Sequence, residues 1–299
     1  MMDIYKEQSS NVRKTWFIMF LFCVVVIAIG WVFAQAFGND GILYFAVLFA
    51  IIMNFFSYWY SDKIVLSMYK AKEVSHESAP DLWNVVENLS ITAGLPMPKV
   101  YIIPDMAPNA FATGRNKEHA AVVVTQGLLN ILNKTELEGV ISHELSHVGN
   151  RDILLSTIVV VLVGFVAILS HIFLRSMMWG GMRRSNNREG NAGAIFVVIG
   201  IILAIFAPIA VTLIQLAISR KREYLADASG ALLTRYPEGL ASALEKIGNY
   251  AQPMKNASEA TAHLFISNPF GSTKKTISNL FATHPPIEKR VAILRGMEK

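Results

Sequence analysis

The stretch VISHELSHVGN, residues 140–150, places two histidines four positions apart, with a glutamate directly after the first. In a helix, residues four apart lie on one face, about 6 Å apart along the axis, so His143 and His147 can bind one ion. Glu144 is turned by about 100° from His143, close enough to reach a water on that ion without binding it. The spacing therefore predicts a helix with a metal site on one face.

The pattern H-E-x-x-H is typical of zinc sites with two imidazole ligands and a carboxylate that acts as a general base. Zinc lowers the pKa of its water towards about 7, so Glu144 could accept the proton and direct the hydroxide at a peptide carbonyl. Chance would give this pattern roughly once in a hundred chains of this length and histidine usage. We therefore favour a metal site over a fortuitous grouping.

A catalytic zinc also needs a third protein ligand and one open position. Glu223 lies just past the last apolar stretch, on the side of the histidines, and Asp227 follows on the same helical face, where a carboxylate could orient a ligand histidine. The alternative is that both acids only offset the basic residues 220–222. On spacing alone, His263 and His284 remain equal candidates for the third ligand.

The composition predicts a multi-pass membrane protein. Of the 299 residues, 53% are hydrophobic and only 16% are charged, against about 25% charged in soluble domains. The apolar residues gather in four blocks that are long enough for membrane helices, at about 15–37, 41–60, 153–173 and 193–216. The net charge of +5 does not indicate nucleic-acid binding, because the basic residues flank the apolar blocks. The single cysteine, Cys23, excludes a disulfide framework.

The first two blocks should form a tight hairpin, since only residues 38–40 separate them. The basic residues lie on its outer ends, which predicts that both ends face the cytoplasm; they are Lys6, Arg13 and Lys14 before it and Lys63, Lys70 and Lys72 after it. Residues 34–36, Ala-Gln-Ala, resemble a signal-peptidase site. The apolar stretch is longer than a signal peptide needs, so an uncleaved anchor is the favoured interpretation.

The last two blocks present a conflict. If both span the membrane, the loop between them lies outside, yet it is rich in arginine, with only Glu189 against Arg175, Arg183, Arg184 and Arg188. That distribution opposes the positive-inside tendency. We expect the pair to span, with a shallower membrane-embedded hairpin as the alternative.

The polar parts predict a mostly α-helical fold with a small antiparallel β-sheet. A helix should start near residues 78–81 and stop at Gly94. The runs KVYIIP, NAFATG and AAVVVT, at 99–104, 109–114 and 120–125, are β-prone. Residues 135–138 match a capping box for the H-E-x-x-H helix, which can run on into the third block.

Four parts are therefore expected along the chain. They are a transmembrane hairpin at 1–60, a cytoplasmic catalytic part at 61–152, a second hairpin at 153–218 and a cytoplasmic helical part at 219–299.

Five stretches of the sequence resemble the HtpX family of membrane-bound zinc metalloproteases. PNAFATGR, VVVTQGLL, ELEGVISHELSHV, SRKREYLADASGA and THPPIEKR stand in the family's order over nearly the whole chain. The resemblance implies a zincin fold of the gluzincin type, with one zinc ion per chain, Glu223 as its third ligand and Asp227 beside it. It also implies a protease of the bacterial inner membrane that faces the cytoplasm and removes damaged or misassembled membrane proteins.

The resemblance also implies roles for four other residues. PNAFATG is similar to an edge strand that holds an extended substrate, with Asn109 and Ala110 as contacts, and an unpaired strand edge can accept a peptide; a core or turn role is the alternative. His284 and Arg290 resemble a pair that the related CAAX-prenyl proteases place near the zinc to stabilise the oxyanion. The alternative for them is a helix start followed by a solvated Arg290.

We therefore predict an integral-membrane zinc endopeptidase that acts on polypeptides. Its expected partners are membrane proteins and the lipid bilayer. The alternative is a non-catalytic zinc-binding sensor or scaffold, which would have no need of Glu144. A transporter is disfavoured, because transporters carry polar or ionisable residues within their spans. Here the charged residues cluster outside the apolar blocks, and Asn54 is the most notable polar residue within them.

Overall fold

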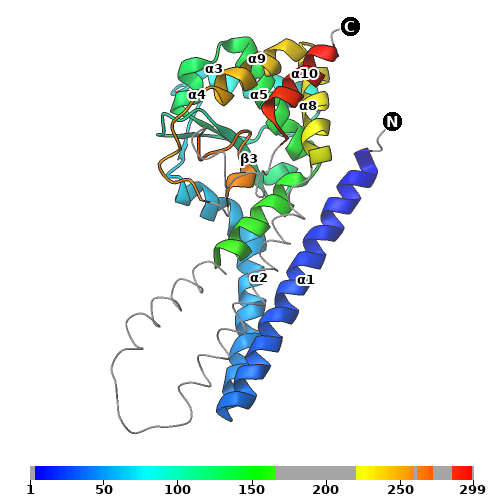
Figure 1. Ribbon diagram of the computed structural model, residues 1–299, viewed down its shortest axis with the longest axis vertical. Coiled ribbons are helices and arrows are strands. Elements are labelled where there is room, and N and C mark those ends of the chain that lie inside the picture. The colour runs from blue at the N-terminus through cyan, green and yellow to red at the C-terminus, as the bar shows by residue number, and fades with distance from the viewer. Residues whose placement is uncertain (1–3, 166–219, 259–260, 272–284, 298–299) are drawn as a thin grey trace.

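Two long helices form a stem below a globular part of the molecule (Figure 1). The computed structural model describes residues 4–165, 220–258, 261–271 and 285–297. The predicted fold class is confirmed in outline: most elements are helices, and one sheet has four strands. The Arg-rich loop and the fourth apolar block lie outside the described residues. The spanning of the last two blocks therefore stays a prediction.

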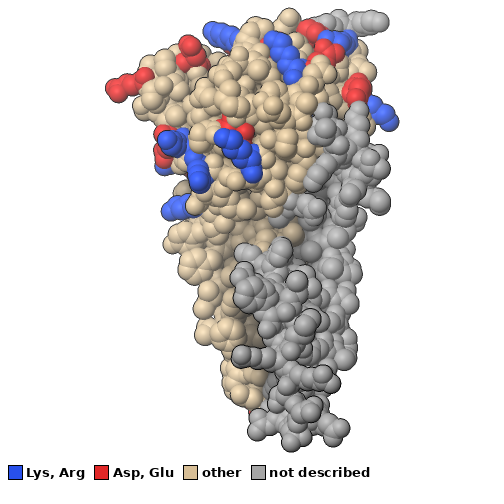
Figure 2. All heavy atoms as spheres, turned by 60° about the vertical axis from the view of Figure 1, so that its left-hand side comes forward, with Lys and Arg blue, Asp and Glu red and all other residues tan. Residues whose placement is uncertain are grey.

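Helices α1 (Ile4–Phe37) and α2 (Gly41–Met68) make the stem, with the short turn that the sequence predicted between them. Within them, Ser9–Ala28 and Gly41–Met68 are long and apolar enough to cross a membrane. The helices approach closely at Gly30, where an added Cβ would lie 2.2 Å from the Cβ of Ala46. On the face shown in Figure 2, the acidic and basic residues lie over the globular part, and the described lower stem has none.

Helix α5 (Lys134–Gly149) carries the H-E-x-x-H pattern and does not continue into the third apolar block. Arg151 has a φ of +58°, and the next helix, Asp152–Phe165, leaves at 84° to α5. The expectation of one continuous helix is therefore wrong. The second helix instead packs its apolar side against α1, where Ile18 and Phe22 meet Leu155.

The sheet is mixed, which corrects the predicted antiparallel sheet. Its strands are β1 (Lys72–Glu73), β2 (Lys99–Ile103), β3 (Ala110–Gly114) and β4 (Ala120–Thr125), in the order β1-β2-β4-β3. Strands β3 and β4 form an antiparallel hairpin, and β4 returns between β3 and β2. Strand β2 consequently runs parallel to β4. This order leaves β3 at the edge.

Helix ends follow the sequence in one case and differ from it in another. Helix α3 (Pro80–Ala93) begins with proline and ends at Gly94, whose φ is +63°, as predicted. The N-cap of helix α5, Asn133, lies two residues before the predicted capping box. The Asn133 side chain accepts the backbone N–H of Glu136, and the Glu136 carboxylate accepts the backbone N–H of Asn133. The expected box at 135–138 is therefore wrong, because asparagine provides the cap.

In the described residues the globular part also contains the α-helices α4 (Gln126–Ile131), α8 (Arg220–Thr234), α9 (Pro237–Gly248) and α10 (Ile287–Gly296), and the short 3-10 helices η1 (Lys117–His119) and η2 (Ala262–Leu264). Helices α8 and α9 pack on α5, and the core between them contains Val140, Ile141 and Leu244. Contact between α5 and α8 is tight at Gly230, where an added Cβ would lie 3.0 Å from the backbone nitrogen of His143. The glycine lets α8 lie directly against the H-E-x-x-H turn of α5.

Candidate metal centre

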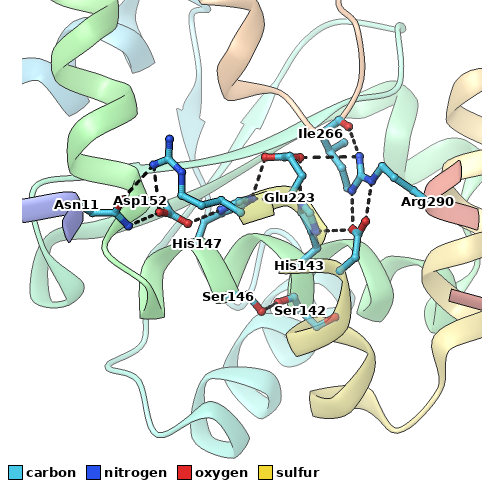
Figure 3. A network of polar contacts seen from close by, with 11 residues as sticks. Asn11, Ser142, His143, Ser146, His147, Asp152, Glu223, Ile266 and Arg290 are labelled. Atoms are coloured by element: carbon cyan, nitrogen blue, oxygen red, sulfur yellow. Dashed lines mark hydrogen bonds and ion pairs between the residues drawn. The ribbon is translucent and has the colours of Figure 1, made fainter. Parts of the chain in front are cut away.

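Two helices bring together three metal-binding side chains. His143 and His147 come from α5 and Glu223 comes from the first turn of α8, and one ligand atom from each lies within 4.8 Å of the others. The two Nε2 atoms are 3.2 Å apart. The Glu223 oxygens lie 3.7 Å from Nε2 of His147 and 3.9 Å from Nε2 of His143 (Figure 3). Of the two candidates for the third ligand that lie in the described residues, Glu223 and His263, Glu223 is the one that lies beside both histidines.

The chemistry of this donor set fits a zinc ion. Nδ1 of His143 lies 2.9 Å from Oδ1 of Asp227, and Nδ1 of His147 lies 3.0 Å from Oδ2 of Asp152. A carboxylate beside each Nδ1 favours a proton there and leaves the Nε2 lone pairs facing one another. Two lone pairs and a carboxylate that converge in this way need a cation between them. Tetrahedral zinc with bonds of about 2.0–2.1 Å would hold two nitrogens roughly 3.3 Å apart.

The surrounding charges also favour a cation. Burial alone would lower the pKa of His147, but Asp152 and Glu223 outweigh it and raise the pKa to about 9. With Nδ1 already holding a proton toward Asp152, the second proton of a charged His147 would lie on Nε2, between the two imidazoles and beside Glu223. A bound metal ion would take the place of that second proton.

Asp227 is itself held by Arg290, which comes from α10. Nε and Nη2 of Arg290 donate to the two carboxylate oxygens at 2.8 and 2.7 Å, and Nη1 donates to the carbonyl of Ile266 at 3.0 Å. Both side chains of the pair are at most 1% exposed. Burial would raise the pKa of Asp227, but Arg290 and His143 outweigh it and lower the pKa to about 2. Asp227 is therefore an anion that faces His143, as its spacing from Glu223 indicated.

Glu144 lies buried in the same centre, with 2% of its surface exposed. Burial raises the pKa of its carboxyl group to about 7, and the neighbouring charge of Glu223 adds to the rise. His147, Arg290 and the backbone N–H of Ala112 act in the opposite direction. A carboxyl group with a pKa near neutrality can both accept and return a proton.

The other predicted site residues lie in different surroundings. His263 is outside the metal group and has its Nε2 3.1 Å from the carbonyl of Ser156. His284 lies outside the described residues. Asn109 is 2% exposed and donates its side-chain amide to the carbonyl of Ser267 at 3.0 Å. The expected role of Asn109 as a substrate contact stays a prediction.

The outer edge of β3 is partly covered by the chain itself. The backbone N–H of Ile266 donates to the carbonyl of Ala110 at 2.9 Å. Backbone groups two residues apart on a strand point to the same side, so those of Ala112 point outward as well. There the Ala112 N–H meets Glu144. The outer edge of β3 is therefore covered by Ile266 at Ala110 and faces the buried carboxylate of Glu144 at Ala112.

Sequence reasoning missed Asp152 as a partner of His147. In one continuous helix, residues five apart are turned by about 140° from each other, so Asp152 would point away. The break at Arg151 returns the carboxylate to the imidazole. One signal could have revealed the contact: Asn150 and Arg151 are residue types that are common at helix ends, and an acid follows them directly.

These features define a metallopeptidase of the zincin class. One helix carries two histidines, a later helix supplies a glutamate, and a small sheet has an edge strand beside them. The sequence model of peptidase family M48 matches residues 76–298. This chain belongs to that family, and the resemblance to HtpX proteins is confirmed by its relatives.

A protease HtpX homolog from Caldanaerobacter subterraneus subsp. tengcongensis is 50% identical over 297 residues, 98% of both chains. A second one, from Thermococcus sibiricus, is 48% identical over 288 residues, 94% of both chains. The crystal structure of S. mikatae Ste24p aligns with a TM-score of 0.51 at 17% identity, covering 97% of this chain and 67% of that one. The last likeness concerns the fold alone.

Proposed function

We propose that this metalloendopeptidase holds one zinc ion with His143, His147 and Glu223 and uses Glu144 as its general base. The observation that carries the proposal is the pair of Nε2 atoms facing each other at 3.2 Å next to the buried Glu144. When bound, zinc supplies Lewis acidity that acidifies water and polarises a carbonyl. Glu144 accepts the proton of the attacking water and returns it to the leaving amine.

The proposed substrate is an extended polypeptide that adds to the outer edge of β3. Ala112 is the position where that edge meets Glu144. Contacts to Asn109 and Ala110 would require the Ile266 segment to move, because it now occupies the Ala110 carbonyl. A transition-state role for Arg290, and with it His284, would compete with the bonds of Arg290 to Asp227 and Ile266.

We further propose that the protein lies in the bacterial inner membrane, with the catalytic part on the cytoplasmic side. The two candidate spans and the basic residues at their outer ends support this orientation. A centre at the end of membrane helices can meet segments that emerge from the bilayer. Damaged or misassembled membrane proteins are therefore the proposed substrates.

The base is tested by replacing Glu144 with glutamine in the detergent-purified protein. The parent should cleave an unfolded polypeptide with zinc present, whereas Glu144→Gln should bind one zinc and not cleave. Glu138→Gln, on the same helix, is the matched control and should keep the activity. Equal cleavage by the parent and Glu144→Gln would rule out this base. Zinc in both without cleavage would favour the sensor or scaffold.

The substrate class is tested with the enzyme in a lipid bilayer and one polypeptide in two forms, soluble and fused to a membrane anchor. Each form is also made as a folded parent and as a destabilised variant. We expect faster cleavage of the anchored form than of the soluble form, and of the destabilised variant than of its folded parent. Equal rates for all forms would argue against a role in membrane-protein quality control.

A further inference from the structure

The N-terminal part of α1 reaches the metal centre through one side chain. Asn11 is fully buried, and its Nδ2 donates to the carbonyl of Asn150 at 3.1 Å and to Oδ1 of Asp152. Its Oδ1 accepts Nη1 of Arg222 at 3.4 Å. Figure 3 shows Asn11 at one end of a row of polar groups that leads through Asp152 and His147 to Glu223.

Asp152 divides its two oxygens between this network and the metal centre. Oδ1 accepts from Asn11 and lies 3.3 Å from Nη1 of Arg222, while Oδ2 lies 3.0 Å from Nδ1 of His147. The carboxylate can rotate only by breaking contacts on both sides. Its orientation, and with it the direction of the His147 ring, depends on the donors that hold Oδ1.

The break between α5 and the following helix makes these contacts available. Helix ends leave carbonyl groups without partners inside the helix, and Asn11 binds the carbonyl of Asn150 at this end. Apolar packing of α1 on this helix is already provided by Ile18 and Phe22, which share a core cluster with Leu155. The buried amide of Asn11 therefore contributes chiefly through its hydrogen bonds.

We propose that Asn11 is a positioning residue for the metal centre. Its amide fixes Oδ1 of Asp152 so that Oδ2 orients His147 and favours a proton on Nδ1. The candidate span Ser9–Ala28 is thereby linked to the metal ligand His147 by two contacts, Asn11 to Asp152 and Asp152 to His147. The inference rests on the proposed zinc site, because the imidazole is positioned for a metal at Nε2.

The test measures zinc affinity by chelator competition in the purified full-length protein. Asn11→Leu keeps the size of the side chain and removes its donors. It should weaken zinc binding about 10-fold, the lower end of the loss that follows when the direct partner of a ligand is removed. The visible absorption spectrum of the cobalt-substituted protein should change with it. Should Asn11→Leu fail to fold, Asn11→Ala provides the same test.

Thr15→Val is the matched control. Thr15 is equally buried one turn further along α1, but its hydroxyl donates only to the carbonyl of Asn11 at 2.9 Å. It should leave zinc affinity and the cobalt spectrum unchanged. If Asn11→Leu also leaves both unchanged, Asn11 serves packing alone and the proposal is wrong. A loss of the same size in Thr15→Val would likewise reduce Asn11 to a packing role.

A double-mutant cycle then asks whether Asn11 acts through Asp152. In an Asp152→Asn background, Asn11→Leu should have little further effect on zinc affinity, because the carboxylate that it positions is gone. Fully additive losses would overturn the proposal and leave the zinc site standing. A parent protein that binds no zinc would instead overturn the proposed function itself, so the two failures are distinguishable.

Discussion

Arg290→Met should destabilise the protein strongly. Arg290 has no exposed surface, and its Nε, Nη1 and Nη2 all donate, to Asp227 and to the carbonyl of Ile266. Methionine fills similar space and leaves Asp227, which is 1% exposed, as an anion without its cation. The bonds place Arg290 on Asp227, so its first effect should be on folding and on the orientation of His143.

The size of the effect follows from that burial. Removing one partner of a buried ion pair costs about 3–5 kcal/mol, because the remaining charge stays desolvated. For a domain of about 150–250 residues, each kcal/mol lowers the melting temperature by roughly 2–4 °C. Arg290→Met should therefore melt roughly 6–20 °C below the parent.

The assay is thermal unfolding of both proteins in the same detergent, followed by intrinsic fluorescence. Arg295→Met is the matched control, since Arg295 forms similar paired bonds to Glu238 and Glu245 on the surface. Exposed ion pairs contribute little to stability, so this variant should melt close to the parent. An unchanged melting temperature for Arg290→Met together with lost cleavage would refute this reasoning. It would support the transition-state role that the family resemblance suggested.

Three further predictions concern pH, packing and metal. Burial would raise the pKa of Glu136, but hydrogen bonds from Lys246, Ser242 and the backbone of Asn133 outweigh it and lower the pKa. Ionised Glu136 therefore stabilises the folded protein above the unfolded pKa of about 4.3, and this contribution is lost as the pH falls through the lower folded value. Glu136→Gln should therefore melt below the parent at pH 7, with the gap closing in acid; a gap independent of pH would contradict this. Gly139→Ala would place a Cβ 2.5 Å from the backbone nitrogen of Leu240 and should cost about 1–3 kcal/mol in thermal unfolding. Gly296→Ala, whose added Cβ would have no described atom within 4 Å, should leave the melting temperature unchanged. Equal melting of the two variants would contradict the prediction, because it would mean that α5 and α9 can move apart at little cost. Chelation should lower the melting temperature by the equivalent of about 2.7 kcal/mol relative to zinc at a hundred times its dissociation constant; no shift would exclude a tightly bound ion.

The sequence by itself determined the features that depend on local spacing. Residues four apart on a helix share a face, so His143 and His147 were readable as a ligand pair. The hydropathy of the first two blocks indicated helices long enough for a membrane, and the short turn at residues 38–40 left them no arrangement except a hairpin. Gly94 marked a helix end because glycine adopts positive φ without steric strain.

Tertiary structure decided which distant groups meet. Spacing could not choose among Glu223, His263 and His284, because each depends on how a later segment returns to α5. The choice follows from the close packing of α8 at Gly230, which brings Glu223 to the histidines. The parallel pairing of β2 with β4 likewise depends on where the hairpin inserts, a long-range choice that alternation within each strand does not encode.

The break at Arg151 had the largest consequence for the site. A single residue with positive φ turned the chain by 84°, brought Asp152 to His147 and exposed the carbonyl that Asn11 binds. An apolar run predicts that a helix follows, but it does not show whether that helix is collinear with the one before it. The two metal-binding histidines were therefore fixed by local spacing, while the partners that orient them came from α1, α8 and the helix after the break, which only packing brings together.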